Sequence, residues 1–172
     1  MDTATAEPSV QAVTDRTDTQ QYLTFVVADE QYGVDILRVQ EIKGYTAVTR
    51  IPTMPDYLKG ILNLRGVIVP IIDLRLKFRM EPTEPTPFTV IVVVTVGERV
   101  MGMIVDAVSD VLELPAKEIQ PPPELGGHVD ISFVLGIGSA NDRLVTLLDL
   151  DRVLSGEDVE RVVEAVGDRA GE

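Results

Sequence analysis

Cysteine is absent from this chain, and histidine occurs once, as His128. Without cysteine there is no disulfide framework, no thiolate metal site and no thiol nucleophile. A zinc site would have to be built mainly from carboxylates, which is unusual for zinc. A single histidine without a Gly-x-Ser-x-Gly turn also provides little for a serine hydrolase. The missing residues therefore predict a protein with no metal or other cofactor and no catalytic activity.

Long hydrophobic runs and an excess of positive charge are also missing. The longest apolar run, Val90–Val96, is far short of the ~20 residues needed to span a bilayer, and residues 1–20 lack the basic and apolar parts of a secretion signal. The formal net charge is −13, which argues against a basic surface for nucleic acid or for an anionic membrane. We expect a soluble, cytoplasmic protein with no nucleic-acid partner and no direct membrane insertion.

Two aspartates, Asp73 and Asp149, form the one carboxylate pair that suggests catalysis. Each precedes a leucine at the end of an apolar run. We interpret each of them as the N-cap of a short helix, where a carboxylate accepts hydrogen bonds from free amides. The alternative, a small β-barrel hydrolase in which the pair does acid and base work, stays open.

What the sequence does contain is one pattern repeated. The matching segments are residues 25–42 with 94–111, and residues 60–74 with 136–150. Self-similarity at a fixed offset indicates a duplicated structural unit. Apolar positions shared by the copies report the fold, whereas polar positions that differ, Glu41 and Arg65 above all, are candidates for function.

Each copy of the pattern reads as strands. Alternating and β-branched residues indicate about five short strands per copy. Arg65-Gly66 reads as a hairpin turn in which glycine supplies a positive φ, and Pro70 suggests an edge position or a bulge. Residues 56–59 are compatible with one helical turn. We therefore expect a mainly β fold with two small five-stranded barrels and a few short helices.

Changes in composition mark the ends of the fold. Residues 1–19 show no apolar period, which predicts a disordered tail. A proline-rich linker separates a first barrel, about 20–80, from a second, about 88–154. Residues 155–172 carry a stripe of valines, which predicts an acidic C-terminal helix. Halves of ~60 residues are marginal alone, so we expect the region 20–154 to be a single domain whose barrels share a core.

Three blocks of sequence carry a resemblance to a known family: Val39-Gln-Glu-Ile42, Lys59 to Arg75 with Asn63-Leu-Arg-Gly66 inside it, and Val105 to Val111. They resemble CheW, the coupling protein family of bacterial chemotaxis, over nearly the whole folded part. The resemblance implies SH3-like barrels and no catalysis. It also implies two partners, the cytoplasmic tip of chemoreceptors and the regulatory domain of the histidine kinase CheA. Whether further copies of the adaptor join in rings stays open. The resemblance implies a cytoplasmic protein that is associated with membrane receptor arrays through these partners.

The resemblance also assigns site residues. The receptor-binding groove between the barrels maps onto Val39, Glu41, Gly60, Arg65, Val108 and Val111. The kinase contacts at the barrel ends map onto the neighbourhoods of Tyr45, Lys59 and Leu125. A receptor tip is a helical hairpin, and a groove lined by valines can accept the apolar stripe of a helix. Arg65 next to Glu41 could form an ion pair that positions both groups.

Each assignment has a plainer alternative. The valines can be strand core, and Arg65 can be an exposed turn residue. Gly60 aligns with Gly136 in the second copy, so backbone geometry alone can explain it. For function, one alternative is an adaptor of the same kind in a non-flagellar receptor–kinase pathway. The other is the hydrolase that uses Asp73 and Asp149.

Overall fold

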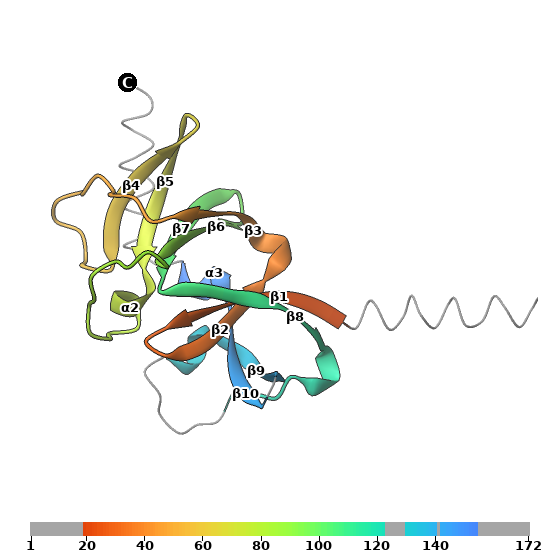
Figure 1. The fold of residues 1–172 in the computed structure, drawn as a ribbon. Coiled ribbons are helices and arrows are strands. Elements are labelled where there is room, and N and C mark those ends of the chain that lie inside the picture. The colour runs from red at the N-terminus through yellow and green to blue at the C-terminus, as the bar shows by residue number, and fades with distance from the viewer. Residues whose placement is uncertain (1–18, 123–129, 141, 155–172) are drawn as a thin grey trace, which may run out of the picture.

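The computed structural model describes residues 19–122, 130–140 and 142–154, and these form a mainly β protein, as predicted (Figure 1). The strands are β1 (Thr19–Val27), β2 (Glu30–Asp35), β3 (Val39–Gly44), β4 (Leu58–Leu64), β5 (Val67–Asp73), β6 (Val90–Val96), β7 (Arg99–Val105), β8 (Ala107–Pro115), β9 (Val134–Ala140) and β10 (Arg143–Leu148). The short helices are α2 (Leu74–Lys77) and α3 (Leu150–Val153), with 3-10 turns η1 (Ile36–Arg38), η2 (Ala116–Glu118) and η3 (Ile131–Phe133). The predicted tail, the predicted C-terminal helix, Leu125 and His128 lie outside the described residues, except that Thr19 begins β1.

The strands form two five-stranded sheets, with the orders β8-β1-β2-β10-β9 and β3-β6-β7-β5-β4. Each sheet therefore takes strands from both sides of the proline-rich linker. The predicted division into a first barrel before the linker and a second barrel after it is wrong. The reason is that the chain crosses over directly after each leading hairpin, so β3 and β8 join the sheet that their own hairpin does not belong to (Figure 1).

The duplication seen in the sequence is present in the topology. Replacing each strand by its counterpart in the other copy converts one sheet order into the other. The parallel pairs also coincide, because Ile71 stands opposite Gly102 and the aligned Leu147 stands opposite Gly33. Isolated bridges then join the segment that follows each edge strand to the strand at the opposite end of the sheet, Thr49 to Ile61 of β4 and Gln120 to Ile137 of β9. Two SH3-like barrels fit this arrangement.

The largest apolar cluster lies between the barrels. It contains side chains from both sheets, among them Phe25 and Tyr32 from one and Val92 and Met103 from the other. Two smaller clusters fill the barrel interiors. Along β6, one set of alternate residues packs in the shared cluster and the other set packs in a barrel interior. Both faces of this strand are therefore buried. This burial explains its unbroken apolar run, and the expectation of a shared core is confirmed.

Several local predictions are confirmed and one is wrong. Asp73 accepts hydrogen bonds from two amides of α2, and Asp149 accepts one from α3, so both aspartates are N-caps. Pro70 pairs only with β4, because the pairing of β5 with β7 begins at the next residue. A proline is tolerated there since no partner needs its missing amide. Residues 56–59 form no helical turn. The amide of Leu58 donates to Pro55 in a tight turn, and β4 then begins.

Candidate functional site

The β4–β5 hairpin presents Arg65 at its tip. Leu64 pairs with Val67, which leaves a two-residue loop of Arg65 and Gly66. The φ angles of these two residues are 50° and 87°, both left-handed, as a type I′ turn requires. The predicted hairpin is confirmed, and the geometry makes Arg65 as well as Gly66 adopt a positive φ. The Arg65 side chain is 77% exposed.

Arg65 and Glu41 form an ion pair through Nη2 and Oε1. Glu41 lies on β3, an edge strand whose residues alternate between half-buried and exposed. Its side chain is 29% exposed, so the carboxylate is held at the surface while the guanidinium reaches it from the neighbouring hairpin. An exposed pair of this kind stabilises the fold by only ~0–1 kcal/mol. The pair therefore shapes the surface more than it holds the protein together.

The three predicted valines occupy different environments. Val39 and Val108 are half-buried and pack against the cluster between the barrels. They are matching positions in the two copies, at the starts of the edge strands β3 and β8. Val111 is 44% exposed. The structure therefore favours a partial core role for Val39 and Val108 and leaves Val111 as an exposed apolar side chain of β8.

Gly60 has a demanding backbone position. Its φ is 149°, and a Cβ added there would lie 2.0 Å from the carbonyl oxygen of Thr49. Thr49 exchanges hydrogen bonds with Ile61 at the bridge between the sheet ends. The alternative based on backbone geometry is therefore sufficient to explain Gly60. Gly136 is similarly crowded, with Gln120 O at 2.8 Å from an added Cβ.

Tyr45 and Lys59 line one hollow of about 410 Å³, and Leu125 is not described. The hollow also contains Asp73 and the ion pair between Arg75 and Asp106. Burial raises the pKa of the Asp73 carboxyl above its ordinary value, although hydrogen bonds from α2 act to lower it. The two kinase-contact candidates that can be placed are thus brought together at the base of α2.

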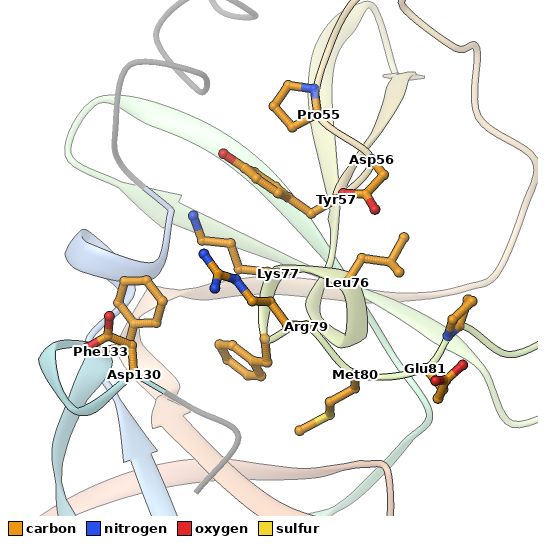
Figure 2. A pocket seen from close by; sticks show the side chains of 12 residues that line it. Pro55, Asp56, Tyr57, Leu76, Lys77, Arg79, Met80, Glu81, Asp130 and Phe133 are labelled. Atoms are coloured by element: carbon orange, nitrogen blue, oxygen red, sulfur yellow. The ribbon is translucent and has the colours of Figure 1, made fainter. Parts of the chain in front are cut away.

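A larger hollow, of about 980 Å³, lies where α2 faces η3 (Figure 2). Lys77 Nζ is 4.3 Å from the ring centre of Tyr57 and 5.4 Å from that of Phe133. Tyr57 and Phe133 are equivalent residues of the two copies. The backbone carbonyl of each accepts a hydrogen bond from the backbone amide of the corresponding N-cap aspartate, Asp73 or Asp149. Our sequence reasoning singled out none of these aromatic residues. The repeat alignment, extended a few residues towards the N-terminus, would have paired them.

The model of the CheW-like domain family matches residues 21–158 of the sequence. The chain belongs to the CheW-like family. The chemotaxis protein CheW of Klebsiella aerogenes is 47% identical over 143 residues, which cover 83% of this chain and 86% of that protein. CheW of Bacillus subtilis is 32% identical over 145 residues, covering 84% and 92%. The protein FrzA of Myxococcus xanthus is 29% identical over 137 residues, covering 78% and 85%.

A solved structure supports the same family and fold. The scaffolding protein TtCheW from Thermoanaerobacter tengcongensis superposes with a TM-score of 0.75 at 32% sequence identity. The match covers 81% of this chain and 90% of that one. Among the described residues of this CheW-like chain, no helix has the length and apolar character to cross a membrane, and no group of three or more metal-ligating side chains gathers.

The hydrolase alternative depended on Asp73 and Asp149 acting together. Each carboxylate instead accepts amide hydrogen bonds at the start of its own helix. Asp73 lines the hollow of Tyr45 and Lys59, and Asp149 does not line it. The pair therefore behaves as two copies of one structural feature, which is what the duplication predicts.

Proposed function

We propose that this protein is a non-enzymatic chemotaxis adaptor that couples chemoreceptors to the histidine kinase CheA. The single observation that carries the proposal is the Glu41–Arg65 pair. It stands on the surface of a CheW-like fold, and the second copy keeps only its acid, because Glu41 matches Asp110 in the repeat whereas Arg65 matches an asparagine. The pair contributes little to stability and stands on a backbone that both copies share. Recognition of a partner therefore explains it better than folding does.

The receptor side of the proposal uses the edge strand β3 and the tip of the β4–β5 hairpin. A helical receptor tip would offer an apolar stripe to Val39, Val108 and Val111, and a polar flank to Arg65 and Glu41. Apolar contact would give affinity, while the charges would fix orientation and register. Val111 is the most accessible of the three valines, so it would be the one to gain most from burial.

The kinase side of the proposal uses the hollow of Tyr45 and Lys59. Both side chains are half-buried, and the hollow mixes charges of both signs with apolar walls. Such a surface suits a protein partner with a polar rim. The regulatory domain of CheA is the partner that we propose. The adaptor would reach the membrane array only through these partners, and it would need no cofactor.

A reconstitution measures the coupling directly. Receptor fragments in arrays and CheA are sedimented with and without the protein, and receptor-dependent autophosphorylation of the kinase is recorded in parallel. We expect co-sedimentation and activation only with the adaptor. Arg65→Glu should abolish receptor binding with an unchanged melting temperature, because the side chain is exposed. Arg143→Glu, on the equivalent hairpin, is the matched control and should bind normally. Kinase that sediments equally well without the protein would contradict the proposal.

A further inference from the structure

The tip of the β4–β5 hairpin holds Arg65 in a conformation that an arginine does not favour. Left-handed φ values come easily to glycine, asparagine and aspartate, and the first position of a type I′ turn favours these residues. In the sequence of the second copy, asparagine and aspartate stand at the two matching positions, and the described one, Asp142, has a φ of 64° just before β10. The second copy therefore has the residues that suit the turn, and the first copy has an arginine instead.

A side chain from the flanking strand restrains this unfavourable turn. The Gly66 amide donates to Asn63 Oδ1 at 2.8 Å. The other described type I′ loop whose first residue is not glycine, asparagine or aspartate begins at Ala28, with Ala28 and Asp29 at φ 52° and 66°. That loop is restrained in the same manner, because the Ala28 amide donates to Asp106 Oδ2 at 2.9 Å. In both loops a side-chain oxygen binds a turn amide and holds the left-handed backbone.

We propose that Asn63 is a positioning residue of the receptor site, which holds the turn so that the Arg65 guanidinium stays against Glu41. The proposal rests on the function proposed above. Asn63 is exposed, so its side chain serves no core packing. Without this hydrogen bond, the loop would sample conformations in which Arg65 points elsewhere. Partner binding would then have to select the competent fraction, which lowers the apparent affinity.

The test compares Asn63→Ala with Asn63→Asp, which keeps an acceptor oxygen at the same place. We expect Asn63→Ala to weaken receptor binding about fivefold. Asn63→Asp should bind the receptor within about twofold of the wild-type protein, because it keeps the acceptor oxygen. The melting temperature should change little, since surface changes usually have small effects. A further variant, Arg65→Asn, creates the favoured Asn-Gly turn. It should melt higher than the wild-type protein and yet lose receptor binding.

The decisive readout is whether Asn63 acts through Arg65. If it does, Arg65→Ala and the double variant Asn63→Ala/Arg65→Ala should bind the receptor equally, because the restraint has nothing left to position. A further fivefold loss in the double variant would overturn the proposal, and so would wild-type binding by Asn63→Ala. Wild-type binding by Arg65→Ala would instead remove Arg65 from the receptor site, which would contradict the proposed function and the positioning role together.

Discussion

Two segments carry the chain from one barrel to the other, and the comparison between them shows how a duplicated fold is held together. After β2, Arg38 of η1 forms two hydrogen bonds with Asp151 of α3, at 3.0 and 3.1 Å. After β7, Asp106 forms two with Arg75 of α2, at 3.0 and 2.7 Å. Asp151 and Arg75 are equivalent in the repeat. Each crossover is therefore tied to the helix of the barrel that it leaves, with the charges reversed.

The two ties differ in burial. The side chains of Arg75 and Asp106 are 20% and 27% exposed, whereas those of Arg38 and Asp151 are 36% and 58% exposed. Asp106 also accepts from the Ala28 amide, and Arg75 donates to the Glu81 carbonyl. The two pairs thus link crossover and helix in the same way, but we expect the more buried pair to matter more, since removal of a half-buried charged partner leaves the other partner poorly solvated.

Separating the halves at the linker should have the largest effect. The strand exchange means that neither half, residues 19–80 or 86–154, contains a complete sheet. Each half expressed alone should be unfolded, which loses the whole free energy of folding, on the order of 5–15 kcal/mol. Mixed or co-expressed halves should regain a β-type circular-dichroism spectrum. A cooperative melt from either half alone would show that the shared core is dispensable.

Gly60 and Gly136, which match in the repeat, should respond unequally to substitution by alanine. Gly60→Ala forces a Cβ to 2.0 Å from a backbone oxygen at a left-handed φ, so we expect a loss of about 3 kcal/mol or more. Gly136→Ala meets the Ile119 side chain at 2.5 Å and the Gln120 oxygen at 2.8 Å, and a loss of about 1–3 kcal/mol is expected. Urea unfolding of both variants measures the difference. Equal losses would mean that the two barrel closures are equally tolerant.

Asp106→Asn should destabilise the protein by about 2 kcal/mol at neutral pH, the range for hydrogen bonds to charged groups. Partial burial acts to raise the pKa of the Asp106 carboxyl, but the hydrogen bonds from Arg75 and Ala28 hold it below its ordinary value. A lowered folded-state pKa gives stability that is present above the unfolded value, about 3.9, and lost as the pH falls further. The gap between variant and wild type should therefore close in acid. A gap that stays constant down to pH 2 would argue against an ionic contribution.

Asp151→Asn should have the smallest effect, below about 1 kcal/mol, because the Arg38–Asp151 pair is open to solvent. The hydrogen bond from Arg38 lowers the pKa of the Asp151 carboxyl in the same direction as for Asp106. High salt should remove most of the difference through screening. Thermal melts at low and high salt would record it, with Asp106→Asn measured alongside. A cost equal to that of Asp106→Asn would erase the distinction between the two crossovers.

Much of this protein could be predicted from its sequence because the relevant signals are local. Alternation and β-branched residues placed the strands, Arg65-Gly66 marked a hairpin, and Asp73 and Asp149 marked helix starts. The aligned Gly60 and Gly136 pointed to a shared backbone requirement. The repeat also indicated which polar residues differ, and so led to Glu41 and Arg65.

Only the tertiary structure decided which strands share a sheet. An apolar pattern fixes which face of a strand is buried but not which strand lies beside it, because β3 and β8 can satisfy the same pattern in either sheet. The path after η1 and after β7 made that choice, and with it the boundary between the barrels. The tertiary structure also decided that Asp106 pairs with Arg75 and that Lys77 lies near the rings of Tyr57 and Phe133. These contacts join residues far apart in the chain, and no local pattern encodes them.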